Sequence, residues 1–196
     1  MSSKKRLLTR EQGQTLVQLA RETLQKQFGI DPPTDSPATA GAQDDPIFQT
    51  PSGVFVTLKM HGDLRGCIGS LTGCDPLWQG VQTHAVNAGF CDPRFPALTR
   101  EELDEVHIEV SVLTEPQSLA YENAEDLVAQ LRPHEDGVIL RKGAAGATYL
   151  PQVWEQLPDA AAFLSSLCVK AGLAADTWRR EPLKVETYQV QYFEEE

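Results

Sequence analysis

The chain has 196 residues, enough to bury one compact hydrophobic core and too few to argue strongly for two independent domains. Hydrophobic residues make up 41% of the sequence and charged residues 23%, which is ordinary globular usage and excludes wholesale disorder. The 17 basic and 28 acidic residues leave a net charge of −11, which disfavours binding to nucleic acid or to anionic membranes. We therefore expect a single domain over residues 1–196.

Signals for cellular location are few. The basic run at residues 4–6 is followed by no apolar stretch long enough for a secretory core or a membrane-spanning helix. No Cys-x-x-Cys pair occurs, which favours reduced thiols over a disulfide framework. The four cysteines are Cys67, Cys74, Cys91 and Cys168. We expect a cytoplasmic protein without a membrane segment.

The first predicted element is an amphipathic helix. Thr9-Arg10-Glu11-Gln12 has the form of a capping box, and apolar residues then recur on one helical face until Gly29 supplies a stop. From Ile30 to Thr50 the chain carries four prolines among small and polar residues, with no periodicity. This composition predicts a long surface loop over about 30–50.

A β-hairpin and a second helix are predicted next. Residues 53–60 are rich in Val, Phe, Thr and Leu, and His61-Gly62-Asp63 forms a plausible turn into a strand over 64–68. Asp75-Pro76 then provides an N-cap and a first-turn proline for a helix that ends near Gly89. A loop is expected to follow, up to residue 98.

The rest of the chain mixes strands and helices in irregular order. We expect a short helix capped by Thr99-Arg100-Glu101-Glu102, a strand over 106–112, a helix over 124–131, strands over 138–142 and 147–150 joined by a turn, a helix from Asp159 to about Lys170, and a closing strand over 185–193. The absence of a strand–helix–strand rhythm favours an α+β fold, with a largely antiparallel β-sheet flanked by helices.

The segment Leu64-Arg65-Gly66-Cys67-Ile68-Gly69 is the first candidate for chemistry. Glycine weakens strands, so Gly66 and Gly69 indicate close backbone approach, a bulge or access for a ligand. Alternation along a strand places Arg65 and Cys67 on one face, where the arginine would stabilise a thiolate. The alternative is a buried, inert Cys67 beside an arginine in an ion pair.

The segment Asp92-Pro93-Arg94-Phe95 is the second candidate. Arg94 would hold a carboxylate or phosphate, and Asp92 would orient it or accept a proton. The alternative is a turn in which Asp92 pairs with Arg94 and Phe95 anchors the loop in the core. A helix over 76–89 is about 20 Å long. We predict that the loop after it folds back along the helix, at least partly, and brings Arg94 to Cys67 in one water-accessible groove.

Other polar residues receive structural explanations. Lys170 complements the dipole at a helix end, and the acidic tail at residues 194–196 is expected to be solvated. No metal is predicted, because the available soft and imidazole ligands occur in no familiar spacing: Cys67, Cys74, His84 and Cys91.

The first candidate segment, with the sequence LRGCIG, resembles the signature of the AMMECR-one domain family, also called AmmeMemoRadiSam system protein A in microbes. The resemblance covers nearly the whole chain. It continues through Phe55-Val56-Thr57-Leu58, Asp92-Pro93-Arg94-Phe95-Pro96, Glu109-Val110-Ser111-Val112-Leu113, Gly137-Val138-Ile139-Leu140, Leu150-Pro151-Gln152-Val153 and Lys170-Ala171-Gly172-Leu173. The resemblance implies a two-lobed domain with an antiparallel sheet, and the signature near a cleft between the lobes.

Three functions remain open at this stage. The first is an enzyme-like domain that binds a small polar or anionic substrate, with Cys67 as nucleophile or radical-accepting thiol, Arg65 as stabiliser of thiolate or substrate, and an unknown cofactor. Its substrate-binding positions would be Gly66, Gly69, Asp92, Arg94 and Phe95. The second is a noncatalytic adaptor for the partners that the resemblance implies, a Memo-type protein and a radical S-adenosylmethionine enzyme. The third is nucleic-acid modification, which the net charge opposes.

Overall fold

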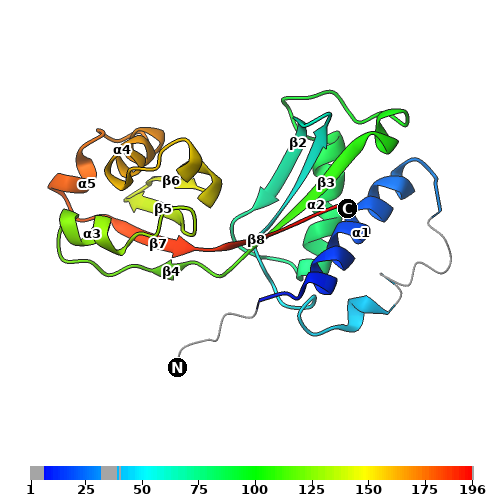
Figure 1. Ribbon diagram of the computed structural model, residues 1–196, viewed down its shortest axis with the longest axis horizontal. Coiled ribbons are helices and arrows are strands. Elements are labelled where there is room, and N and C mark those ends of the chain that lie inside the picture. Colours follow the sequence, from blue (N-terminus) through cyan, green and yellow to red (C-terminus); the bar gives the residue numbers. More distant parts are fainter. Residues whose placement is uncertain (1–6, 32–38, 40, 196) are drawn as a thin grey trace. The chain divides into compact units, whose positions relative to one another are not determined.

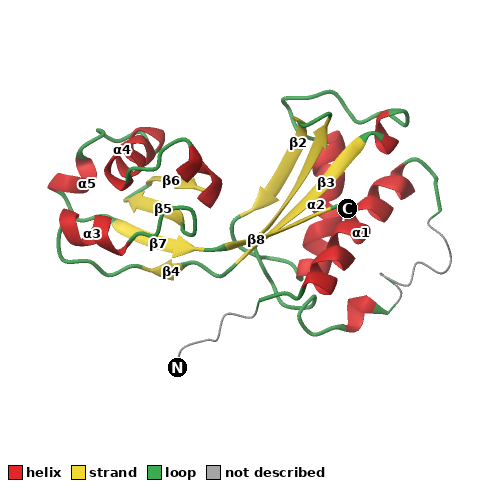
Figure 2. Ribbon diagram, viewed as in Figure 1, coloured by secondary structure: helices red, strands yellow, loops and turns green. Residues whose placement is uncertain are grey.

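A computed structural model describes residues 7–31, 39 and 41–195 (Figures 1 and 2). The chain divides into two compact units: residues 1–114 together with 191–196, and residues 115–190. The expected α+β fold is confirmed, but the described strands form two four-stranded sheets instead of one. The basic run at 4–6 and residues 32–38 of the predicted proline-rich loop lie outside the described residues.

The first unit is a sheet with helices on one face. Its strand order is β2-β1-β3-β8, and β1 pairs antiparallel with both neighbours. The strands are β1 (Val54–Met60), β2 (Asp63–Ser70), β3 (Val106–Leu113) and β8 (Val190–Glu194). The helices are α1 (Arg10–Gln27) and α2 (Leu77–Phe90), with the short 3-10 helices η1 (Ala42–Asp44) and η2 (Glu102–Asp104). Figure 2 shows α1 and α2 against the sheet.

Alternation in the strands explains why one face of this sheet is covered. Val56 and Leu58 of β1 and Ile108 and Val110 of β3 are fully buried against the helices, together with Leu16 and the other apolar residues of α1. The intervening residues of β1 and β3 are polar or partly exposed and therefore lie on the opposite face. The predicted capping box of α1 is confirmed, because Thr9 and Gln12 exchange hydrogen bonds.

The second unit has a sheet of order β4-β7-β5-β6, whose paired strands are antiparallel. The strands are β4 (Gln117–Ser118), β5 (Gly137–Lys142), β6 (Ala145–Tyr149) and β7 (Lys184–Tyr188). The helices are α3 (Ala124–Gln130), η3 (Pro151–Glu155), α4 (Ala160–Lys170) and α5 (Thr177–Arg180). Trp154 stacks on Phe163 at the centre of a separate hydrophobic core, and its indole donates to the Asp136 carbonyl. Each unit thus has its own core.

The end of the chain differs from the expectation. The single strand predicted over 185–193 is two strands, β7 in the second unit and β8 in the first, with a break at Gln189. The acidic tail is not simply solvated either. The Arg21 guanidinium holds the Glu195 carboxylate through two hydrogen bonds of 2.7 and 2.6 Å, and that carboxylate also accepts from the Ile108 N–H.

Within the described part of the chain, no helix combines the length and the apolar character needed to cross a membrane.

Candidate functional site

Cys67 lies on β2, the edge strand of the first sheet, directly opposite Thr57 of β1. The Thr57 hydroxyl donates to the Cys67 sulfur, with 3.3 Å between Oγ1 and Sγ. Directly opposed residues share a face of the sheet, and Thr57 alternates with the buried Val56 and Leu58. The thiol therefore lies on the face away from α1 and α2, where it is half-buried and free.

The backbone of Cys67 is satisfied by two side chains in place of a neighbouring strand. Its N–H donates to Oδ2 of Asp92 at 2.9 Å, and its carbonyl accepts from Nη2 of Arg94 at 3.1 Å. An edge strand otherwise presents such groups unpaired. The Asp92–Arg94 pair thus caps the edge strand at Cys67.

Asp92 and Arg94 form a two-pronged ion pair. Nε and Nη2 of Arg94 donate to the Asp92 carboxylate at 2.9 and 2.7 Å. The Asp92 side chain is 2% exposed, whereas that of Arg94 is 53% exposed. The hydrogen bond from Arg94 is the largest cause that holds the pKa of Asp92 well below its usual range, and backbone N–H donors add to it. Asp92 therefore stays ionised and is a poor proton acceptor.

One nitrogen of Arg94 remains available to a ligand. Among the described residues, no hydrogen bond engages Nη1. The pKa of Arg94 is raised, chiefly by its hydrogen bond to Asp92 and to a smaller extent by the Cys67 thiol. Arg94 is thus a permanent cation that lies close to the sulfur and is half open to solvent.

The predicted proximity of Arg94 and Cys67 is confirmed, but its cause differs from the expectation. The loop after α2 does not need to fold back, because α2 itself runs antiparallel to β2. At the start of α2, the Leu77 N–H donates to the carbonyl of Thr50, which precedes the part of β1 that pairs with the end of β2. Near the end of α2, Ala88 lies against Gly66, close to the start of β2. The helix therefore returns the chain to the strand that precedes it. The water-accessible groove expected around Cys67 and Arg94 stays a prediction.

The described hydrogen bonds of Arg65 go to Glu102 and to the loop after Arg94, so the ion pair of the alternative is present, while a role for Arg65 at the thiol stays a prediction. The register of β1 and β2 shifts between Leu58 and Lys59, which leaves Arg65 as the extra residue of a β-bulge. Its guanidinium is buried and donates to Glu102 at 3.0 and 2.8 Å. It also donates to the carbonyls of Pro96 and Ala97. Arg65 therefore holds the loop after Arg94, and the arginine that reaches Cys67 is Arg94.

Glu102 links this network to the predicted capping box. Its carboxylate accepts from the Thr99 N–H while the Thr99 hydroxyl accepts from the Glu102 N–H. Hydrogen bonding from Arg65, followed by that from Thr99, lowers the pKa of Glu102. A residue predicted only as a cap thus also neutralises the buried arginine.

The two glycines of the LRGCIG segment are explained by packing. A Cβ on Gly66 would lie 2.2 Å from the Ala88 carbonyl oxygen, and a Cβ on Gly69 would lie 2.3 Å from the ring of Phe55. Close backbone approach, one of the alternatives drawn from the sequence, therefore accounts for both. Phe95 is only partly buried and lies under Arg94, with its ring centroid 5.5 Å from the guanidinium carbon.

Polar residues around the thiol were missed from the sequence. Thr57 pairs across the sheet with both Cys67 and Glu109, and the Glu109 carboxylate binds Lys59 Nζ at 2.9 Å. The hydrogen bond to Glu109 raises the pKa of Lys59, so the amine stays protonated at neutral pH. The sequence does carry a signal for these residues, because Thr57, Lys59 and Glu109 alternate with the buried apolar residues of β1 and β3.

The four residues considered as metal ligands do not assemble. Among the described residues, no three His, Cys, Asp or Glu side chains come together in a way that would hold a metal ion. Cys74 and Cys91 are exposed, and desolvation lowers the pKa of His84, which favours a neutral imidazole.

These features define a class: a two-unit α+β protein with a free thiol on an edge strand, capped by an Asp–Arg pair. Comparison with protein families adds a match to the AMMECR1 family over residues 17–193. The chain belongs to this family, in agreement with the resemblance of its motifs.

Relatives cover nearly the whole chain. A protein of Methanothermobacter thermautotrophicus is 38% identical, covering 96% of this chain and 97% of the relative. A protein of Thermofilum pendens is 40% identical, covering 96% and 92%. The crystal structure of an uncharacterized protein from Pyrococcus horikoshii matches with a TM-score of 0.75 and 36% identity, covering 94% of this chain and 91% of that one.

Proposed function

We propose that the chain binds a small polar or anionic molecule beside Cys67 and acts on it through the Cys67 thiol. The observation that carries the proposal is the pairing of a free thiol with an arginine that keeps one nitrogen open. Asp92 immobilises the other two nitrogens of Arg94, so the open Nη1 is held in a fixed position. A donor fixed in advance loses less entropy when it takes a ligand.

The charge balance of the site decides what kind of ligand fits. Asp92 cancels the charge of Arg94, and Glu109 is paired with Lys59. Long-range attraction for anions is therefore weak, and recognition rests on short-range hydrogen bonds from Arg94. A small ligand with a carboxylate, phosphate or similar acceptor group fits this description better than an extended polyanion.

The chemistry of the site rests on the sulfur. A thiolate is a strong nucleophile, and the Thr57 hydroxyl fixes the position of the sulfur. Neither Asp92, which is held ionised by Arg94, nor Lys59, which is held protonated by Glu109, accepts a proton readily at neutral pH. The thiol proton would therefore pass to solvent or to the ligand itself.

The test is mass spectrometry of small molecules and metals that copurify with the protein from its native cells. We expect a polar or anionic compound to be retained by the wild type and by Cys91→Ser, which removes an exposed thiol. Arg94→Gln should reduce its retention about tenfold, the effect of losing one charge-assisted hydrogen bond. Equal retention by Arg94→Gln, or no such compound, would contradict ligand binding at this site.

A comparison of Cys67→Ser with the wild type distinguishes catalysis by the thiol from ligand binding alone. Cys67→Ser should retain the compound but fail to support the biological phenotype of the wild type. If Cys67→Ser keeps both the phenotype and any protein partner, the thiol is not catalytic and the chain acts as an adaptor.

A further inference from the structure

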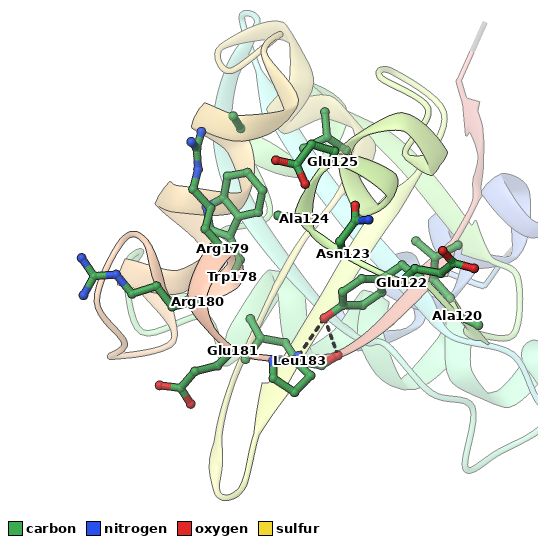
Figure 3. A pocket seen from close by; sticks show the side chains of 15 residues that line it. Ala120, Glu122, Asn123, Ala124, Glu125, Trp178, Arg179, Arg180, Glu181 and Leu183 are labelled. Atoms are coloured by element: carbon green, nitrogen blue, oxygen red, sulfur yellow. Dashed lines mark hydrogen bonds between the residues drawn. The ribbon is translucent and has the colours of Figure 1, made fainter.

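The second unit contains a pocket of about 950 Å³ between α3 and α5 (Figure 3). It lies where β4 and β7 separate. The pairing of these strands continues through the Leu119 N–H, which donates to the Val185 carbonyl. The Tyr121 hydroxyl then donates to the Leu183 carbonyl and accepts from the Leu183 N–H, at 2.9 and 2.7 Å. Tyr121 thus closes the ladder, and the two segments diverge beyond it.

The floor of the pocket is apolar. Leu119, Val128 and Ala161 contribute aliphatic surface from three different segments. Trp178 is 3% exposed, and its indole N–H is fixed by the Ser165 hydroxyl at 3.0 Å. A preformed apolar floor of this kind favours the apolar body of a small ligand.

The charged groups of the pocket divide into paired and unpaired sets. Arg180 is paired with Asp176, and Glu181 with Lys142. Arg179 instead stacks on the Trp178 ring, with 4.6 Å from its guanidinium carbon to the ring centroid. Among the described residues, no ion pair involves Arg179, Glu122 or Glu125, although all three line the pocket. Figure 3 shows Arg179 and Glu125 beside the indole of Trp178, with Glu122 set apart from them on the far side of the pocket.

We propose that this pocket binds a small zwitterion with an apolar body, either a free amino acid or a short peptide. The ligand carboxylate binds the guanidinium of Arg179, which stacking on Trp178 holds in place while leaving its donors free. The ligand ammonium faces Glu125, and the apolar body covers the floor. A purely anionic ligand would leave Glu125 unmatched, and a purely cationic one would leave Arg179 unmatched. This site is independent of Cys67.

The test compares ligands that share one phenyl group and differ in charge. L-phenylalanine and the tripeptide Ala-Phe-Ala are zwitterions, phenethylamine is a cation, 3-phenylpropionate is an anion and 2-phenylethanol is neutral. Each is titrated into the full chain while the indole N–H resonance of Trp178 is followed by NMR. We expect at least one zwitterion to shift this resonance with an affinity at least about tenfold higher than that of the other three compounds.

Variants assign the two charges. Arg179→Gln should weaken zwitterion binding about tenfold and leave phenethylamine unchanged, while Glu125→Gln should weaken zwitterion binding and leave 3-phenylpropionate unchanged. Arg141→Gln, which removes an exposed arginine of the same unit outside the pocket, is the matched control. Cys67→Ser should bind like the wild type, which separates this proposal from the proposed function.

Each outcome decides the proposal. Tighter binding of the tripeptide assigns the pocket to peptides, and tighter binding of phenylalanine assigns it to free amino acids. No saturable shift of the Trp178 resonance with any of the five compounds, no preference for a zwitterion, or an unchanged affinity in Arg179→Gln would overturn it.

Discussion

The Asp92 carboxylate connects β2 with the loop after α2. It accepts from the Cys67 N–H and from the backbone and side chain of Arg94, while the Asp92 carbonyl accepts from the Phe95 N–H in the turn. A buried carboxylate is tolerated only when its oxygens are satisfied in this way. The residue is therefore structural for Cys67 and for Arg94 at once.

The stability that Asp92 contributes should depend on pH. Arg94 holds the pKa of Asp92 below its ordinary value of 3.8, so the stabilisation is fully present above the pH at which an unfolded aspartate titrates. It is lost as the pH falls toward the lower folded-state pKa. We expect Asp92→Asn to lose about 1–3 kcal/mol at pH 7, and the difference from wild type to narrow below about pH 4.

Urea denaturation at pH 7, 5 and 3 measures this dependence. Asp63→Asn removes an exposed carboxylate from the same strand as Cys67 and should change the free energy of unfolding by less than about 0.5 kcal/mol. A constant difference between Asp92→Asn and wild type across these pH values would show that the carboxylate charge is not the stabilising feature.

At the residue scale, the sequence predicted that Cys67 and Arg94 lie close together, and this is confirmed. It did not predict the contacts that bring them together. Arg65 was expected beside the thiol because strict alternation puts it there, and the β-bulge at this position leaves no mark in the sequence beyond Gly66. Thr57 and Glu109 were visible as polar positions in alternating strands, but the pairing of distant strands is needed to bring them to Cys67.

At the element scale, the packing of α2 on β2 positions Asp92 and Arg94. Gly66→Ala would push a Cβ to 2.2 Å from the Ala88 carbonyl oxygen, so the end of α2 must move. We expect a loss of about 1–3 kcal/mol in the free energy of unfolding. Gly146→Ala is the matched control on another strand, because its Cβ would meet its nearest neighbour only at 3.3 Å. Equal losses in the two variants would argue against close packing as the role of Gly66.

The attachment of β8 gives a second prediction at this scale. Glu195→Ala removes the partner of the partly buried Arg21, and we expect a loss of about 1–3 kcal/mol in chemical denaturation. The neighbouring Glu194 side chain is 66% exposed, so Glu194→Ala should cost less than about 0.5 kcal/mol. If the two alanine variants are equally stable, the clamp on Glu195 does not hold the strand.

The elements themselves were largely predictable, and the exceptions have physical causes. The run over 185–193 has no glycine or proline to mark a break, so its division into β7 and β8 follows from pairing in two different sheets. β4 and α5 are too short to show periodicity. The hairpin of β5 and β6 was expected, with a tighter turn than the sequence indicated.

At the scale of the whole molecule, the two separate cores predict separate folding. Residues 115–190 form a continuous segment with its own sheet and a core around Trp154 and Phe163. We expect this fragment, expressed alone, to give dispersed amide resonances and a cooperative thermal transition. A spectrum typical of an unfolded chain would show that the second unit depends on the first.

The most direct test of the central claim, that Cys67 and Arg94 form one accessible site, is alkylation of the native full-length protein by iodoacetate and iodoacetamide. Peptide mass spectrometry reports each cysteine separately, with exposed Cys74 as reference and Cys168, whose pKa is raised by burial, expected to stay unmodified. We predict that Cys67 reacts in the folded protein. Arg94→Gln should lower its iodoacetate-to-iodoacetamide rate ratio about threefold without changing that of Cys74. A Cys67 thiol that reacts only after unfolding, or a ratio insensitive to Arg94→Gln, would contradict the account.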